Sequence, residues 1–337
     1  MFELETKIAL ANIDVLARSR ALLIGVEPPV VVAALDHADH VSVFQHDLRT
    51  FRACAGFDEA RYDAWLENLE PFDAAVVQMP KELKRLEMVM AMVRPLMIAG
   101  GSVALVGHNR AGVRGGAKVL AVRVGEPRLV DFRSHCRVYA ATVPTDAAPR
   151  ARLDEWEHAF RIEVRGRSFD VRSFPGVFSH GKLDPGTALL LESMQVAHGA
   201  RALDIGCGAG VIAAWLGAEG VHVDAVDVDA LALEATRRTL AANGGEGRVF
   251  ASDVYSDAPG PYDLIVGNPP FHRGIRTTTA VSERLIRGAP DRLESGGELW
   301  IVANRTLDHR AAFEAAFQRV DVAAETRRYR VWRARRR

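Results

Sequence analysis

Apolar and polar residues alternate along the second half of the chain in blocks that predict strands and helices in regular succession. Short apolar runs predict buried strands at 202–205, 221–227, 248–251, 262–267, 298–303, 320–324 and 329–334. Amphipathic runs between them predict helices at 188–196, 211–216, 229–240, 281–293 and 310–317. Strands that alternate with helices are typical of a parallel α/β sheet. The pattern therefore predicts an α/β domain with seven strands, of which the last two form an antiparallel hairpin.

The first half of the chain repeats part of this pattern. Its opening residues predict a helix at 8–22, strands at 30–35 and 41–44, and a helical stretch up to Leu69. The segment Asp73–Lys81 then parallels Asp263–Phe271, because each has an Asp, an apolar strand and a closing proline. Gly100–Arg110 likewise parallels Gly296–Arg305. Matched segments in the same order predict an internal duplication. Unrelated α/β domains can, however, also have strands and Gly-Gly turns in this order.

A turn-rich segment separates the two halves. The residues Pro144–Pro149 carry two prolines and no apolar run, which is typical of a linker. Alternating residues in Phe160–Arg172 then flank a central Arg165-Gly166 pair, which predicts a β-hairpin. We therefore expect one domain over residues 1–145 and a second over residues 146–337.

Composition limits the classes of function. Lysine and arginine number 43 and so do the acidic residues, so the net charge is zero and any nucleic-acid surface must be local. The three cysteines are widely spaced and odd in number, which argues against disulfides and a zinc site and favours a reducing cytoplasm. No signal peptide and no run of the ~20 apolar residues that cross a bilayer is found. We expect a cytoplasmic protein without a metal or a membrane partner.

A glycine-rich turn in the second half provides the clearest chemistry. The predicted strand that ends at Ile205 runs into Gly206, Gly208 and Gly210, and a predicted helix follows. Glycines at such a turn allow positive φ and let a ligand approach the main chain. The next strand ends in Asp227, which is placed to accept hydrogen bonds from a ribose. The unit therefore predicts a nucleotide-binding site.

The glycine spacing alone does not decide between cofactors. In the dinucleotide fingerprint G-x-G-x-x-G the third glycine comes one residue later than Gly210, and Asp204 suits a cationic ligand better than a pyrophosphate. The segment Asn268–Phe271, which reads Asn-Pro-Pro-Phe, follows the strand 262–267. Together these segments resemble motifs I and IV of the class I S-adenosylmethionine-dependent methyltransferases that modify exocyclic amino groups. The resemblance implies S-adenosylmethionine as cofactor.

The same resemblance implies the fold and the role of each half. Two tandem Rossmann-like methyltransferase domains are expected, each with a seven-stranded, mostly parallel sheet. The first copy lacks the glycine turn and reads Gln78–Lys81 (Gln-Met-Pro-Lys) where the second has Asn268–Phe271. It is therefore expected to be a degenerate copy that has lost cofactor binding and keeps a structural or RNA-binding role.

Residues at the carboxyl ends of the strands form the expected site. Asp204 and the turn would hold the methionine part of the cofactor, Asp227 the ribose, and Asp253 the adenine amino group, with Val254 against the ring. The expected cofactor-binding set is Asp204, Gly206, Cys207, Gly208, Gly210, Asp227, Val228, Asp253, Val254 and Asn268.

The segment Asn268, Pro269, Pro270 and Phe271 is the catalytic hypothesis. An exocyclic amine is a poor nucleophile because its lone pair is delocalised into the ring. The Asn268 side chain and the Pro269 carbonyl could accept its two N–H groups and aim the lone pair at the sulfonium methyl, which is a positioning effect. Phe271 offers a face for a flipped base. His272 is expected to be a loop or substrate contact rather than a base.

Further segments narrow the resemblance. Gly176–Thr187, Leu240–Gly244 and Ser295–Leu299 are similar to segments of bacterial two-domain small-subunit ribosomal RNA guanine-N2 methyltransferases. That family implies 16S rRNA of the 30S subunit as substrate, with Lys182 and Asp184 lining the cofactor or base pocket. The basic end of the chain, 327–337, holds Arg330 among aromatic residues and could contact RNA. We expect a monomer or a weak oligomer.

Other readings remain open at this stage. Large-subunit rRNA guanine, DNA adenine or protein glutamine are alternative amine substrates, because Asn-Pro-Pro-Phe does not separate them. A non-catalytic RNA-binding assembly factor is a third class, which the first half alone would support. A dehydrogenase is disfavoured by the glycine spacing.

Overall fold

The computed structural model describes residues 2–16, 19–67, 69–146, 148–269 and 276–337. These residues form two compact units, which divide between Glu157 and His158. The linker expected at Pro144–Pro149 therefore lies within the first unit, shortly before its end. Among the described residues no helix combines the length and apolar character needed to cross a membrane.

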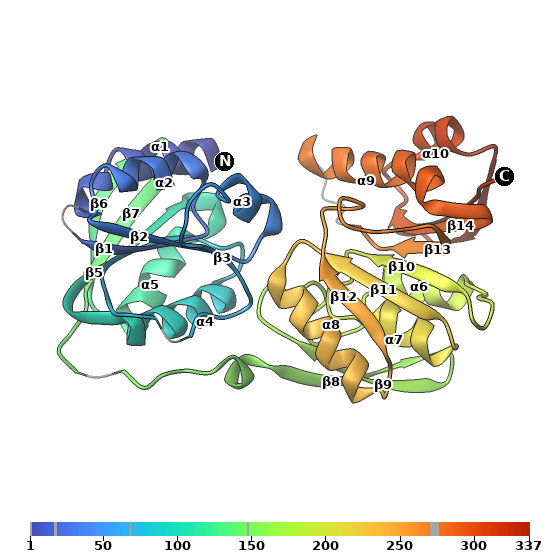
Figure 1. Ribbon diagram of the computed structural model, residues 1–337, viewed down its shortest axis with the longest axis horizontal. Coiled ribbons are helices and arrows are strands. Elements are labelled where there is room, and N and C mark those ends of the chain that lie inside the picture. Colours follow the sequence, from blue (N-terminus) through green and yellow to red (C-terminus); the bar gives the residue numbers. More distant parts are fainter. Residues whose placement is uncertain (1, 17–18, 68, 147, 270–275) are drawn as a thin grey trace. The chain divides into compact units, whose positions relative to one another are not determined.

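The first unit is a seven-stranded sheet with helices on both faces (Figure 1). Its helices are α1 (Phe2–Leu10), α2 (Pro28–Leu35), α3 (Leu48–Ala53), α4 (Leu83–Val93) and α5 (Val113–Arg123), with 3₁₀ turns η1 (Ile13–Leu16), η2 (Arg94–Leu96), η3 (Asn109–Ala111) and η4 (Leu153–Trp156). Its strands are β1 (Arg20–Ile24), β2 (His40–Gln45), β3 (Ala60–Tyr62), β4 (Phe72–Gln78), β5 (Met97–His108), β6 (Pro127–Arg133) and β7 (Cys136–Thr142). The strand order is β3-β2-β1-β4-β5-β7-β6, with β7 antiparallel to both β5 and β6.

The second unit repeats this architecture. Its helices are α6 (Pro185–Ser193), α7 (Val211–Ala218), α8 (Ala230–Ala242), α9 (Arg276–Gly288) and α10 (Arg310–Ala316), with η5 (Ala289–Arg292). Its strands are β8 (His158–Val164), β9 (Arg167–Ser173), β10 (Arg201–Ile205), β11 (His222–Asp227), β12 (Gly247–Ala251), β13 (Tyr262–Gly267), β14 (Leu293–Asn304), β15 (Arg319–Glu325) and β16 (Tyr329–Arg335). The order β12-β11-β10-β13-β14-β16-β15 is that of the first sheet, and β8 and β9 form the expected separate hairpin. The two tandem methyltransferase-like domains predicted from the sequence are confirmed.

The repeat extends to single residues at the first strand of each sheet. Strand β1 reads Arg-Ala-Leu-Leu-Ile and strand β10 reads Arg-Ala-Leu-Asp-Ile, and a glycine with positive φ follows each. The backbone N–H of Arg20 donates to the Asp73 carboxylate at 2.8 Å, and that of Arg201 donates to Asp263 at the same distance. The shared ties hold the central strand pair of each sheet in the same register.

The elements predicted before residue 36 are wrong. The run expected to be one helix at 8–22 contains the end of α1, the turn η1 and the start of β1, and the strand expected at 30–35 is the helix α2. Two prolines occupy the first turn of α2, where a missing N–H is tolerated, and Val30, Val31 and Ala34 are buried on one face of the helix. The glycine turn is also not entirely lost, because Gly25 keeps a φ of 69° after β1.

The cores lie between each sheet and its helices. In the first unit α1 and α2 cover one face of the sheet, while α4 and α5 lie on the other (Figure 1). In the second unit α9 and α10 bury Leu285, Ile286 and Phe313 against the strand residues Ile265 and Leu299. Burial on both faces explains why the central strands are almost continuously apolar. It also leaves the carboxyl ends of the parallel strands as the place for polar chemistry.

Candidate active site

The glycine turn after β10 forms an open cradle. Gly206, Gly208 and Gly210 have φ values of 72°, 55° and 77°, which side chains other than glycine rarely adopt. A Cβ on Gly206 would meet no atom within 4 Å, so the main chain there is accessible. At Gly210 a Cβ would lie 2.8 Å from Thr236 Cα, so this glycine lets α7 start against α8. The turn thus presents bare backbone next to a helix N-terminus, which favours a ligand carboxylate.

Asp227 stands beside this cradle at the end of β11. Its carboxylate accepts the backbone N–H of Gly208 at 3.2 Å and that of Asp229 at 3.0 Å. Burial, together with the charge of Asp229, raises its pKa to about 6 in spite of these bonds. The carboxylate is therefore largely ionised at neutral pH and fixed in place, as an acceptor for ribose hydroxyls must be.

Asp204 is fully buried near the carboxyl end of strand β10. Neither of its side-chain oxygens has a hydrogen-bond partner among the described residues. Burial and the nearby charge of Asp227 raise its pKa to about 8. A buried acid without a partner is costly, so its presence beneath the glycine turn indicates a positively charged ligand. The ammonium and sulfonium groups of S-adenosylmethionine fit this requirement, and a pyrophosphate does not.

Asn268 follows β13 and lies across the cavity from the turn. Its side-chain nitrogen donates to Asp184 Oδ1 and to Thr187 Oγ1, each at 2.9 Å. Asp184 also caps α6 by accepting the N–H groups of Gly186 and Thr187. An ionised carboxylate can only accept, so it fixes the nitrogen of the Asn268 amide towards α6. The amide oxygen then faces away from α6, and no donor among the described residues binds it.

The segment before α6 supplies residues that motif reasoning did not single out. Phe178 remains 55% exposed, and its Cβ lies 3.8 Å from the position that a Cβ on Gly208 would take. An exposed aromatic ring in a glycine-rich loop was the available signal. The cavity is lined by Phe178, Ser179, Leu183, Asp184, Thr187, Gly206, Cys207, Gly208, Ala209, Val211, Ile212 and Asn268. Most of the expected turn residues, with Asp184 and Asn268, are therefore brought together.

Other expected residues lie apart from this cavity or have other contacts. Lys182 is exposed and does not line it. Asp253 forms an ion pair with Arg284 of α9 at 2.5 Å. Val254 is buried in the hydrophobic core with a φ of 59°, an unusual conformation for a β-branched residue. Val228 follows Asp227 at the sheet edge, and Pro269 is buried directly after Asn268.

Two residues of the catalytic hypothesis and one expected substrate contact cannot be compared with the fold. Pro270, Phe271 and His272 lie outside the described residues. Their assignments stay predictions.

The basic end of the chain is largely engaged with its own domain. Arg330 pairs with Glu325 at 2.5 Å and lies over the Trp332 ring, and Arg333 pairs with Glu298. The Trp332 ring is fully buried and stacks on Phe313, so it is a core residue and is not available to RNA bases. The arginine and aromatic residues in 327–337 therefore mainly serve to pack β16 within its own domain.

Comparison with known proteins identifies the family. Residues 6–160 match the family model "Methyltransferase small domain N-terminal", and residues 168–333 match "Methyltransferase small domain". The chain is 37% identical over 333 residues to ribosomal RNA small subunit methyltransferase C of Aeromonas hydrophila, covering 95% of this chain and 96% of that relative. The Pseudomonas entomophila protein of that name is 41% identical over 266 residues, 78% of this chain and 79% of its own length.

The chain belongs to the ribosomal RNA small subunit methyltransferase C family. Among solved structures, its fold is similar to that of a 16S rRNA guanine N2 methyltransferase (RsmC) from T. thermophilus, determined in complex with AdoMet and guanosine. The TM-score is 0.86 at 24% identity, and the match covers 98% of this chain and 92% of the other. Both units, and not the second alone, therefore share the fold of this family.

The first unit of this family member has closed its copy of the site. Gln45 replaces the acid that ends β11, and its side-chain nitrogen donates to the Val26 carbonyl at 2.8 Å. Glu27, Pro28 and Pro29 occupy the positions at which the second unit has its glycine turn. The start of α2 therefore carries a carboxylate, and its two prolines have no N–H to donate. Gln78, the counterpart of Asn268, donates to the buried Glu5 at 3.2 Å. The counterparts of Asp227 and Asn268 are thus held by internal contacts, and prolines replace part of the glycine turn.

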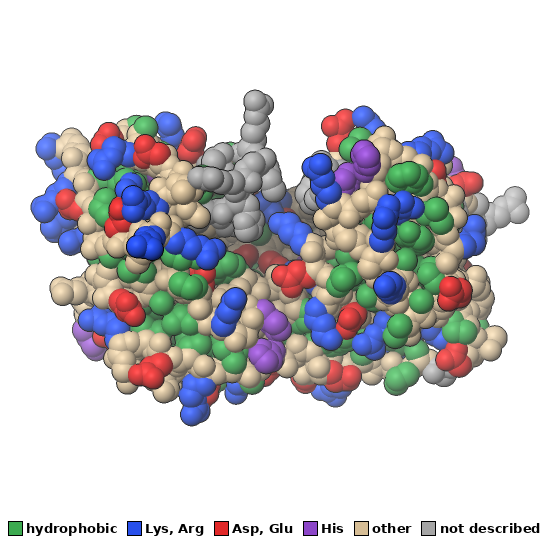
Figure 2. All heavy atoms as spheres, turned by 180° about the vertical axis from the view of Figure 1, so that it is seen from behind, with side chains coloured by type: hydrophobic (Ala, Val, Ile, Leu, Met, Phe, Trp, Pro, Cys, Tyr) green, Lys and Arg blue, Asp and Glu red, His purple; other side chains and the backbone are tan. Residues whose placement is uncertain are grey.

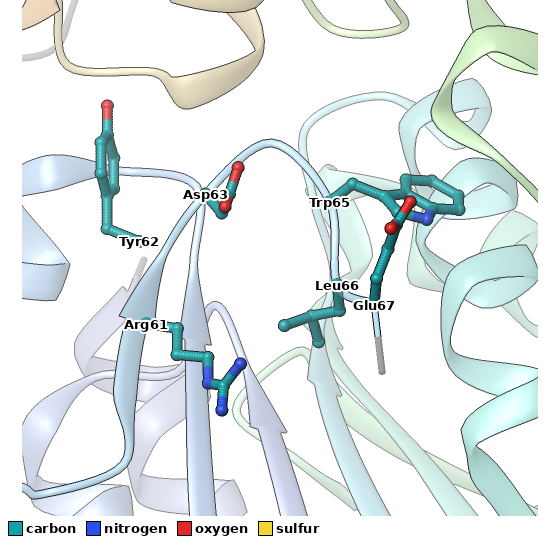
Figure 3. A pocket seen from close by; sticks show the side chains of 6 residues that line it. All are labelled: Arg61, Tyr62, Asp63, Trp65, Leu66 and Glu67. Carbon is teal, nitrogen blue, oxygen red and sulfur yellow. The ribbon is translucent and has the colours of Figure 1, made fainter. Parts of the chain in front are cut away.

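A cavity of about 580 Å³ lies after β3 in the first unit, at the sheet edge that corresponds to Asp253 in the second. Figure 3 shows that its two aromatic side chains, Tyr62 and Trp65, lie at opposite sides of the opening. Arg61, Asp63 and Glu67 bring charges of both signs. These side chains do not converge on one point, so the cavity does not reproduce the nucleoside site of the second unit.

Proposed function

We propose that this chain transfers the methyl group of S-adenosylmethionine to N2 of a guanine in 16S ribosomal RNA. Family membership and the geometry at Asn268 support this activity. The proposed cofactor-binding groups are the glycine turn with Cys207, Asp204, Asp227 and Val228, and, towards the adenine, Asp253 with Val254. Bound S-adenosylmethionine supplies a methyl group on a positively charged sulfur that a neutral amine can attack.

The orientation of the Asn268 amide carries the proposal. Since Asp184 and Thr187 accept from its nitrogen, its oxygen is left to accept an N–H of the guanine amino group. The backbone carbonyl of Pro269 is proposed to accept the second N–H. Two acceptors would draw the amino group out of conjugation with the ring and direct its lone pair at the methyl group. Phe271 and the exposed ring of Phe178 at the cavity are proposed to stack on the base.

Most of the work in this mechanism is positioning. The methyl group is already activated by the positive sulfur, so no side chain has to remove a proton from the amine before transfer. The proton leaves after the new N–C bond has formed and the nitrogen has become positively charged. Asp184, through the Asn268 amide, adds a negative field that favours this charge.

Finer features of the activity belong to the same proposal. We take the substrate to be 16S rRNA within the 30S subunit, methylated in the cytoplasm by a monomer or a weak oligomer. The first unit would then serve RNA binding and structure, since its own cofactor site is closed by Gln45 and Glu5.

Methyl transfer from tritiated S-adenosylmethionine tests the proposal. The substrates would be 30S subunits, 50S subunits and naked 16S rRNA from cells that lack this protein, followed by nucleoside analysis. Label in N2-methylguanosine from 16S rRNA is expected, and Asn268→Ala should abolish it without loss of cofactor binding. Gln318→Ala, which removes an exposed amide on the same unit, is the matched control. Label in 50S RNA or in adenine would refute the substrate, and full activity of Asn268→Ala would refute the mechanism.

A further inference from the structure

A small cavity in the first unit is lined only by histidine, asparagine and arginine residues. It has a volume of about 230 Å³ and is lined by His108, Asn109, Arg110 and His135. The first three residues follow one another at the end of β5 and in η3, and His135 comes from the turn between β6 and β7. The N–H of Asn109 donates to the His135 carbonyl at 2.8 Å, which ties the two segments together.

The side-chain acceptor atoms of His108 and Asn109 are already used. His108 Nδ1 accepts the backbone N–H of Arg110 at 3.0 Å, so its other ring nitrogen carries the proton. Asn109 Oδ1 accepts from Arg137 Nε at 2.9 Å, which turns its NH₂ group outwards. Hydrogen-bond donors therefore remain, from an imidazole, an amide and a guanidinium. A cluster of donors without a free carboxylate favours an anion.

The lining side chains themselves carry no negative charge, although the buried Glu5 carboxylate accepts the backbone N–H of His108 at 2.8 Å. No acidic side chain lines it within the described part of the chain. The helix α5 begins at Val113, three residues after Arg110. Its exposed residues Arg114 and Lys118, one helical turn apart, are also basic. On the face that Figure 2 shows, basic and acidic side chains are interspersed.

The second unit provides an internal comparison. There Asn304 ends β14 and Arg305 follows it, as His108 ends β5 and Asn109 follows it, and Arg305 pairs with Glu325 at 3.4 Å. Glu325 ends the outer strand of the hairpin, and in the first unit that strand ends in Arg133 instead. The strand end that carries an acid in the second unit thus carries a base in the first, and that base pairs with Asp131 at 2.8 Å.

The turn that presents His135 is also strained. Ser134 and His135 both have positive φ, at 47° and 65°, although a turn of this kind favours Asn and Gly. Such conformations cost of order 1 kcal/mol each, and they are retained mainly where a site needs them. Here the strain places the exposed imidazole next to His108, with 6.1 Å between the ring centroids.

We propose that the pocket of His108, Asn109, Arg110 and His135 binds a phosphate group of the RNA backbone. It gives the first unit, which binds no cofactor, a defined contact with the substrate. A phosphate oxygen accepts from the His108 ring and from the Asn109 amide, and the guanidinium of Arg110 binds a second oxygen. The proposal rests on RNA as the substrate of the proposed function.

Variants of the two exposed residues test the pocket in the full-length protein. Arg110→Ala should weaken the affinity for naked 16S rRNA roughly tenfold, the size of a lost hydrogen bond to a charged group. The slope of log affinity against log salt should fall by about 0.7–0.9, the value for one phosphate contact. His135→Asn, which tolerates the positive φ, should weaken affinity in the same direction. Arg110→Lys keeps the charge and should retain the slope with reduced affinity.

Lys7→Ala is the matched control, because Lys7 is an exposed base of the same unit that already pairs with Glu3. For Arg110→Ala the KM for RNA should rise while kcat and cofactor affinity stay unchanged. Wild-type RNA affinity and salt slope in the folded Arg110→Ala and His135→Asn variants would overturn the pocket and leave the proposed function intact. Absence of methyl transfer to 16S rRNA by the wild type would instead overturn the proposed function.

Inorganic phosphate distinguishes an RNA site from a site for a free anion. Its binding is followed through the imidazole NMR signals of His108 and His135. Phosphate that shifts these signals and competes with RNA for the wild type, but not for Arg110→Ala, supports the proposal. Phosphate that shifts the signals while the variants bind RNA normally would show an adventitious ion only and would overturn it.

Discussion

The Thr187 hydroxyl is the neutral half of the pair that orients Asn268. It accepts from the Asn268 amide at 2.9 Å and is buried on α6. We predict that Thr187→Val lowers kcat about tenfold, because Val keeps the shape but loses the acceptor, and the amide can then rotate. Thr187→Ser should keep most of the activity. Steady-state kinetics with saturating RNA measure both variants.

A purely structural role for Thr187 would give a different result. Loss of packing would change the midpoint of thermal unfolding and the cofactor affinity together, and Ser would be about as harmful as Val. Loss of orientation should lower kcat while calorimetric cofactor affinity stays near that of the wild type. Equal kcat values for Val and Ser would contradict the prediction.

The carboxyl group of Asp204 should report cofactor binding through a proton. Its pKa is raised to about 8 by burial and by Asp227, so at pH 7 the group is mostly protonated. A cationic ligand favours the charged form of Asp204 and lowers this pKa. Binding at pH 7 should therefore release almost one proton for each cofactor molecule bound. Calorimetry in buffers of different ionisation enthalpy measures the release. It should vanish above pH 9 and in Asp204→Asn, and equal binding enthalpies in all buffers at pH 7 would contradict it.

At the scale of single residues, the sequence predicted which residues form the site better than it predicted their contacts. The glycine turn and Asn268 follow from motif spacing, because the backbone geometry requires those residue types. The ion pair between Asp253 and Arg284 joins residues on different elements, so no local pattern reports it. For the same reason the pairing of Asp184 with Asn268, 84 residues apart, could not be derived from the sequence.

At the scale of elements, the start of α7 depends on a glycine that has no room for a side chain. Gly210 has a φ of 77°, and a Cβ would lie 2.8 Å from Thr236 Cα. We predict that Gly210→Ala destabilises the fold by about 3 kcal/mol, from backbone strain and overpacking together. Gly244→Ala is the control, because its φ is 65° but no atom lies within 4 Å of an added Cβ. It should cost only about 1 kcal/mol.

Urea unfolding followed by circular dichroism measures both glycine variants. The difference between them isolates the contact between α7 and α8 from the strain that the two positions share. Gly210→Ala should also weaken cofactor binding, because the turn must move to relieve the contact, whereas Gly244→Ala should not. Equal destabilisation by the two substitutions would show that the close approach to Thr236 is readily relieved.

Elements of the second half could be predicted because each strand is bounded by glycine, proline or acidic residues. Between Ile8 and Leu35 the boundary residues Gly25, Pro28 and Pro29 separate β1 from α2, but no glycine or proline separates α1, η1 and β1. Apolar residues follow one another there through α1, η1, β1 and α2, and a short buried strand then has no periodicity that distinguishes it from a buried helix. The five-residue repeat of β1 in β10 was the better signal, since similarity to a recognised strand does not depend on periodicity.

At the scale of the whole molecule, the two copies of the fold differ at the position of the cofactor site. Both sheets have the same strand order, yet only the second keeps an acid at the end of its second strand. The sequence predicted the repeat and the loss of the Asn-Pro-Pro-Phe segment. It could not predict that Glu5, from a helix early in the chain, fills the corresponding site by bonding Gln78.

This closure predicts one cofactor site per chain despite two copies of the fold. Calorimetry of the full-length protein with S-adenosylmethionine should give a stoichiometry of one. Asp227→Ala should remove most of this binding, because the ribose loses its acceptor and Gln45 in the first unit cannot supply another. A Gln45→Ala variant should bind as the wild type does. A second binding event, or binding that survives in Asp227→Ala but fails in Gln45→Ala, would place the cofactor in the first unit and contradict the division of roles.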